Sequence, residues 1–254
     1  MRYAFKVLSR QIPTIAPNGI VNGASFDSPI APGSYITIGG SNLTDLTARA
    51  TGAILPLALD LASVSFDVPS AGISVPGHLA YASPTQINLQ APWELQGQTS
   101  AQVKVNIEYP EATLVSGILN GNVVTVAVAD YAPGLFANNG VVAALDATSQ
   151  PLTSANPARA GQTIELFANG LGPVTNQPAS GDPAPYSPLA ETKATPLVLI
   201  GGLPAQVSFS GLAPGFAGLY QVNVVAPAGL TPGIQPVTIA IGGKTSKAST
   251  ILIQ

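Results

Sequence analysis

The chain has 254 residues, of which only 8% are charged, well below the roughly 25% that is usual in globular proteins. The sequence has one histidine and no cysteine, which excludes disulfides, thiol catalysis and Cys- or His-rich metal sites. We expect no cofactor. The net charge of −3 without a basic stripe argues against nucleic acid as a partner, and no apolar run has the roughly 18–20 residues of a transmembrane helix.

The first ten residues form a short basic arm ahead of an acidic body. The arm contains no acid and three of the nine cations, which are Arg2, Lys6 and Arg10. If the arm is extended, the apolar residues at alternating positions point to one side; they are Met1, Tyr3, Phe5 and Val7. We expect this arm to add as a strand to an exposed sheet edge of a neighbouring copy. Pairing with its own first domain, or disorder, is the alternative.

Short β-branched runs separated by turn residues fill the rest of the chain. The clearest runs are bounded by Gly, Pro or Asn, and they cover residues 35–38, 103–107, 123–128, 163–167 and 237–241. Asn-Gly pairs, as at Asn139-Gly140, supply the positive φ angles that tight hairpins need. No stretch of a dozen residues keeps a helical period. The pattern therefore predicts an all-β fold of sandwich type.

An internal repeat divides the chain into two copies. Residues 31–43 match residues 159–171 in pattern, which places Gly33 128 residues ahead of Gly161. Farther on, Gln-Ile-Asn-Leu-Gln-Ala-Pro at 86–92 matches Gln-Val-Asn-Val-Val-Ala-Pro at 221–227. The sequence predicts two tandem immunoglobulin-like β-sandwiches related by this repeat, over residues 19–131 and 132–254. Residues 1–18 form the arm and a proline-containing spacer.

The amides of the first copy alternate with apolar residues, so that Gln86, Asn88 and Gln90 share one face of a strand. We expect these side chains to bond loop backbone that lacks a strand partner. A ligand site built on them is the alternative.

The order of these motifs resembles that of a known family. The blocks that carry the resemblance lie at residues 19–26, 30–34, 82–94, 156–161, 168–174 and 211–223. They are similar to an uncharacterised C-terminal domain family that is abundant in secreted proteins of acidobacteria. The resemblance covers residues 19–254, and it implies an exported bacterial protein with an immunoglobulin-like β architecture and no established catalytic residue. The first eight residues lack the apolar core of a convincing signal peptide.

Two aromatic side chains are candidate site residues. His78 lies in a predicted turn, and because the sequence has no Gly-x-Ser-x-Gly elbow we expect no catalytic role for it. Trp93 either stacks on a sugar or fills a sandwich edge or domain interface. The aspartates are spread over separate segments and lack the spacing of a calcium loop.

These observations favour a non-catalytic structural protein at or outside the bacterial surface. We expect its copies to associate through the N-terminal arm into a fibre or surface layer. The alternative is a surface-attached module that binds a polysaccharide or another protein, with Trp93 as a ligand-binding residue.

Overall fold

A computed structural model describes residues 11–109 and 117–254 of the chain. Strands and loops make up this part, together with two 3₁₀ turns, η1 (Pro69–Ala71) and η2 (Trp93–Leu95). No α-helix occurs among the described residues, and none of their helical turns is long and apolar enough to cross a membrane. The prediction of an all-β fold is confirmed.

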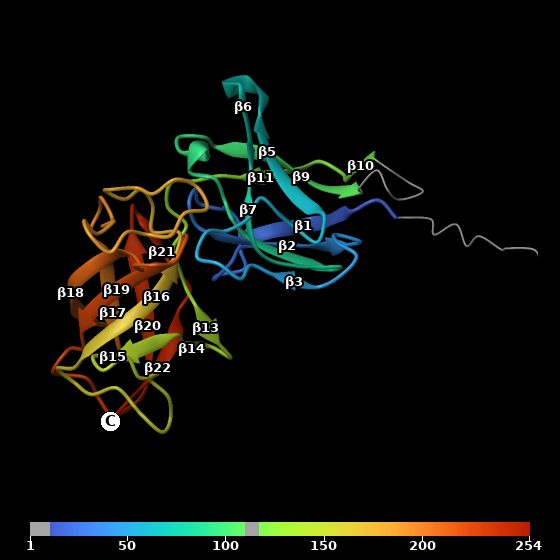
Figure 1. The fold of residues 1–254 in the computed structure, drawn as a ribbon. Coiled ribbons are helices and arrows are strands. Elements are labelled where there is room, and N and C mark those ends of the chain that lie inside the picture. The colour runs from blue at the N-terminus through green and yellow to red at the C-terminus, as the bar shows by residue number, and fades with distance from the viewer. Residues whose placement is uncertain (1–10, 110–116) are drawn as a thin grey trace, which may run out of the picture.

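Two sheets form the first half of the molecule and enclose one hydrophobic core (Figure 1). One sheet has the strand order β1-β2-β8-β7-β3, with β1 (Thr14–Asn22), β2 (Tyr35–Ser41), β8 (Gln86–Gln90), β7 (His78–Ser83) and β3 (Ala48–Arg49). The other contains β10 (Gly117–Asn120), β9 (Ser100–Tyr109), β5 (Ala62–Val68), β4 (Ala58–Leu59), β11 (Val124–Ala127) and β6 (Ile73–Pro76). Alternation along the strands, as in β2, sends Ile36 and Ile38 into the core and leaves Thr37 on the outer face.

One continuous sheet of eleven strands forms the second half. Its main path runs through β12 (Gly134–Leu135), β16 (Thr163–Asn169), β19 (Tyr220–Val225), β18 (Leu203–Leu212), β17 (Leu197–Ile200), β20 (Gly233–Ile241), β22 (Ser249–Ile253), β14 (Val141–Val142) and β13 (Ala137–Asn138). Two short strands pair beside this path, β15 (Ala144–Asp146) on β16 and β21 (Lys244–Thr245) on β20.

In the second sheet, β18 divides its length between two neighbouring strands. Ala205 near its start pairs with Val198 of β17, and Leu212 at its end pairs with Tyr220 of β19. The sheet is nearly closed around its core, and an immunoglobulin-like sandwich for this half stays a prediction.

The strand pairing of the second half nevertheless repeats that of the first. Thr37 of β2 lies opposite Asn88 of β8, and the residues at matching positions of the second half, Glu165 and Asn223, also lie opposite each other. The register of the next strand shifts at the same place in both halves. The shift falls between Leu79 and Tyr81 in β7, and between Val207 and Phe209 in β18. The repeat seen in the sequence is thus present in the hydrogen-bond ladders.

The repeated Gln-x-Asn motif has a local structural role in both halves. Gln86 Nε2 donates to Asn88 Oδ1 over 2.8 Å, and Gln221 Nε2 donates to Asn223 Oδ1 over the same distance. Gln90, at 0% exposure, behaves as expected for an amide that satisfies loop backbone. Its Nε2 donates to the carbonyl of Gly33 and its Oε1 accepts from the amide of Gly181.

Candidate binding cleft between the two halves

The side chain of Asn169 joins the two halves by imitating a strand partner. Asn169 is the last residue of β16 and is fully buried. Its Oδ1 accepts from the backbone amide of Tyr35 over 2.9 Å, and its Nδ2 donates to the Tyr35 carbonyl over 2.7 Å. A third bond runs from Asn169 Nδ2 to Asn22 Oδ1 over 3.0 Å. The start of β2 is therefore fixed against the end of β16.

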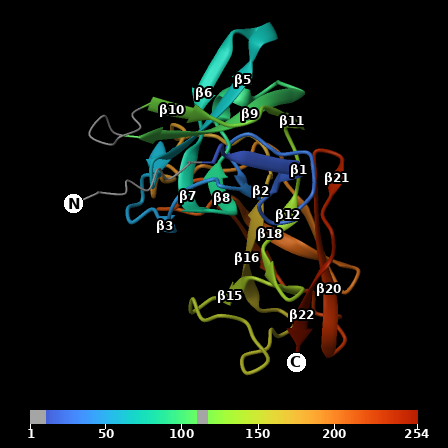
Figure 2. The ribbon, with the colours of Figure 1, turned by 90° about the vertical axis from the view of Figure 1, so that its right-hand side faces the viewer.

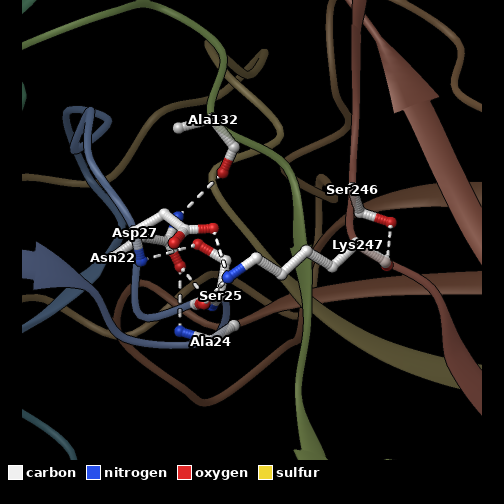
Figure 3. A network of polar contacts seen from close by, with 7 residues as sticks. All are labelled: Asn22, Ala24, Ser25, Asp27, Ala132, Ser246 and Lys247. Carbon is white, nitrogen blue, oxygen red and sulfur yellow. Dashed lines mark hydrogen bonds and ion pairs between the residues drawn. The ribbon is translucent and has the colours of Figure 1, made fainter.

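Asn22 extends this network to the segment that links the halves (Figure 3). Its Nδ2 donates to the carbonyl of Ala132, and its Oδ1 accepts from the amides of Ala24 and Ser25. Lys247 of the second half reaches the same loop, where Nζ lies 2.6 Å from Asp27 Oδ2. Both side chains of that ion pair are largely exposed. The hydrogen bonds of the buried amides therefore contribute more to holding the two halves together.

Trp93 also lies where the two halves meet. It is 4% exposed and belongs to the hydrophobic core of the second half, although it comes from the first. Its ring covers Gly33 so closely that a Cβ at that position would lie 2.2 Å from the ring. The backbone amide of Trp93 donates to Ser180 Oγ. Burial places the ring in the packing of the junction, and its role as a ligand-binding residue stays a prediction.

His78 packs nearby, against the loop that holds Ser180. Its ring lies against Gly181, and its buried Nδ1 has no hydrogen-bond partner. Burial lowers the pKa of His78, an effect that the negative charges of Glu94 and Asp182 oppose. The neighbouring Ser180 hydroxyl donates to Glu94 over 2.7 Å, and within the described residues no hydrogen bond joins it to His78. The serine is thus oriented toward the carboxylate instead of toward the imidazole.

One row of side chains crosses the outer face of the first sheet, one strand at a time. The row is set by strand register: Thr37 lies opposite Asn88, Asn88 opposite Tyr81, and Tyr81 opposite Arg49. These four residues come from β2, β8, β7 and β3. The Arg49 guanidinium lies over the Tyr81 ring, 4.8 Å from its centroid, a distance at which cation–π attraction operates.

The second half supplies the opposite wall of a cleft over this row. Phe136 follows β12, Phe167 belongs to β16, and Leu219 directly precedes β19. Together with the row and with Tyr35 they line a hollow of about 450 Å³. Figure 1 shows the second half at the lower left of the first, and Figure 2 shows it below the strands β1, β2 and β8. The halves are held in this position by the Asn169, Asn22 and Trp93 contacts, so the cleft depends on the junction.

The cleft combines aromatic surface with a few polar groups. Most of its lining side chains are half-buried, which leaves part of each ring in contact with solvent. Burial raises the pKa of Tyr35, so its hydroxyl stays protonated and can donate a hydrogen bond. The bond from Gln86 to Asn88 Oδ1 fixes the Asn88 amide and leaves its Nδ2 as a second donor.

The sequence prediction found Asn88 within its motif, but it missed Arg49, Tyr81, Phe136 and Phe167. The predicted assembly residues are Arg2, Lys6, Arg10, Met1, Tyr3, Phe5 and Val7, and all of them lie outside the described residues. In residues 11–109 and 117–254, no three His, Asp or Glu side chains gather closely enough to hold a metal ion.

No protein-family model matches the chain, and no curated protein matches it. One similar solved structure is SGBP-B of the Bacteroides ovatus mixed-linkage glucan utilization locus, in complex with a mixed-linkage heptasaccharide, at 13% identity and a TM-score of 0.36. Another is the plexin A4 full extracellular region, domains 1 to 8, at 11% identity and a TM-score of 0.24. Each match covers 97% of this chain, but the chain spans only 47% and 26% of those proteins. Membership of the acidobacterial domain family stays a prediction.

Proposed function

We propose that the chain is a non-catalytic binding module of the bacterial exterior that binds a polysaccharide in the cleft between its halves. The observation that carries this proposal is the row Thr37-Asn88-Tyr81 facing Phe136 and Phe167 across a hollow of about 450 Å³. Ligand sites of this kind are concave, mostly apolar and equipped with a few placed polar groups.

The chemistry of the cleft suits a sugar. A pyranose ring has an apolar face that packs on an aromatic side chain, and its rim of hydroxyl groups needs donors and acceptors. Tyr81, Phe136 and Phe167 offer the aromatic surface. Tyr35 and Asn88 offer hydrogen bonds, and the Asn88 amide is already oriented by Gln86. A ligand bound there therefore orders few side chains on binding, which lowers the entropic cost.

The size of the cleft favours a short stretch of glycan over a folded protein. Its volume lies within the roughly 300–1,000 Å³ of small-molecule sites. A stable protein partner buries about 800 Å² on each side, which would need a broad face instead of a hollow.

The two halves, residues 19–131 and 132–254, are proposed to be diverged copies of one immunoglobulin-like sandwich. The equivalent registers of β2-β8 and β16-β19 support this origin. Assembly into a fibre through residues 1–10 stays a prediction, because it depends on residues outside the described part. Deleting residues 1–10 and comparing particle size by light scattering tests it.

The binding proposal is tested with a matched pair of variants. Tyr81→Ala removes a ring from the cleft, whereas Phe209→Ala removes a ring at the equivalent register position of the second half, outside the cleft lining. After a glycan array identifies a ligand, calorimetry should show at least about tenfold weaker binding for Tyr81→Ala, as for a central aromatic contact. Phe209→Ala should bind as the unchanged protein does. Equal losses in both variants, or no glycan bound by the unchanged protein, would contradict the proposal.

A further inference from the structure

Arg49 gives the cleft a charge that its own walls do not balance. It stands at the end of the row, in the two-residue edge strand β3, and its side chain is exposed. It is the one charged residue among those that line the hollow. Within the described part of the chain, no carboxylate lies at ion-pair distance from its guanidinium.

The contact with Tyr81 prepares Arg49 to bind an anion. The guanidinium lies over the ring, and in the described part of the chain no hydrogen bond or ion pair uses its N–H donors, so they remain available to a ligand. The ring also restricts the rotation of a long side chain, which reduces the entropy lost when a ligand binds. Arginine donors in a fixed fork match the two oxygens of a carboxylate. The row therefore presents a placed carboxylate-binding group beside the surface proposed to hold a sugar.

We infer that the cleft selects acidic glycans, and that Arg49 binds the carboxylate of a uronic acid residue while the sugar ring packs against the aromatic walls. This inference rests on the proposed function. It specifies the ligand class within the same site, since Thr37, Asn88 and Tyr35 bring hydrogen bonds but no further charge.

The equivalent row of the second half has the opposite charge character. There Glu165 replaces Thr37 and Phe209 replaces Tyr81, while Asn223 keeps the place of Asn88. A carboxylate in that row would repel a polyuronate. The preference for an acidic ligand therefore belongs to the first row alone, and this makes the second half a source of control variants.

The test compares one ligand in two chemical forms. Oligogalacturonate is bound to the full chain in calorimetry, beside the same oligosaccharide after reduction of its carboxyl groups to primary alcohols. The acidic form should bind at least about tenfold more tightly than the reduced form, as expected for a charge-assisted pair of hydrogen bonds. Its affinity should fall as salt rises, and that of the reduced form should not.

Variants of Arg49 then locate the effect. Arg49→Gln should remove the tenfold preference for the acidic over the reduced form. Arg49→Lys should keep only part of this preference, because an ammonium lacks the fork of donors. Arg159→Gln makes the same change of charge at an exposed site outside the cleft and should have no effect.

The outcomes separate this inference from the function on which it rests. Equal binding of both forms, with loss only in Tyr81→Ala, would overturn the acidic preference and leave the glycan-binding proposal intact. Tighter binding of a sulfated galactan than of the uronate would overturn the assignment of a carboxylate. The inference would also be overturned if none of the three glycans bound and Arg49→Gln were indistinguishable from the unchanged protein. If the glycan array were negative too, the proposed function would be overturned as well.

Discussion

Replacing Gly33 by alanine measures the packing of Trp93 at the junction, because the repeat supplies a matched control. Gly33 and Gly161 occupy equivalent turns, with φ angles of +72° and +78°. An alanine in this left-handed conformation costs about 1–2 kcal/mol at either position. At Gly33 the new Cβ would also lie 2.2 Å from the Trp93 ring, whereas nothing lies within 4 Å of it at Gly161. Overpacking of this kind costs about 1–3 kcal/mol more.

The expected free energy of unfolding is therefore lowered by about 2–5 kcal/mol in Gly33→Ala and by about 1–2 kcal/mol in Gly161→Ala. Urea unfolding followed by fluorescence reports on the site directly, since Trp93 is the single tryptophan. Its emission should also move to longer wavelength in Gly33→Ala, because the displaced ring meets water. In a Trp93→Leu background the two glycine variants should cost about the same. Equal costs with tryptophan present would refute the packing argument.

Three further outcomes are expected. Asn169→Ala leaves the Tyr35 amide and carbonyl without their partner and should cost about 2–4 kcal/mol in urea unfolding; a cost no larger than that of Asn223→Ala, whose side chain has only a local partner, would contradict this. Lys247→Ala removes a largely exposed ion pair and should change the same quantity by no more than about 1 kcal/mol. Burial lowers the pKa of His78 below 6.5, so the folded form binds this proton less readily than the unfolded chain does. Stability should therefore fall as pH drops below about 6.5, and identical melting profiles of the unchanged protein and His78→Gln between pH 7.5 and 5.5 would count against it.

The all-β fold could be predicted because its determinants are local. The alternation of apolar and polar residues along segments such as 163–167 indicates which side chains face the core, and the positions of Gly and Asn indicate the turns. The Gln-x-Asn repeat could also be predicted, since the same local hydrogen bond joins Gln86 to Asn88 and Gln221 to Asn223. The near closure of the second sheet could not be predicted from the sequence. It depends on which distant strands pair, as where β18 pairs first with β17 and then with β19, and a strand-length pattern of apolar residues does not encode such pairing.

Most of the cleft could not be predicted, because its residues are brought together by contacts between distant segments. Arg49 and Tyr81 are neighbours only through the register of β3 on β7, and neither lies in a motif. Phe136 and Phe167 come from the other half and face the row because Asn169 fixes β16 to β2. The sequence left two interpretations of Trp93 open, a sugar-stacking ring or a ring that fills a sandwich edge or domain interface. Its 4% exposed ring lies at the interface between the two halves.

The two rows show how a repeat can give one cleft instead of two. Asn88 and Asn223 keep the same place, the same partner strand and the same bond to a glutamine, so strand register alone does not create a binding cleft. The difference comes from what lies opposite each row. Two tandem halves meet at one junction. In this chain the junction places the second half over the first row, and Phe136, Phe167 and Leu219 form the far wall of the cleft. Under the proposed function, Tyr81 and Arg49 of the first row contact the ligand, whereas Glu165 and Phe209 belong to a row that does not line this cleft.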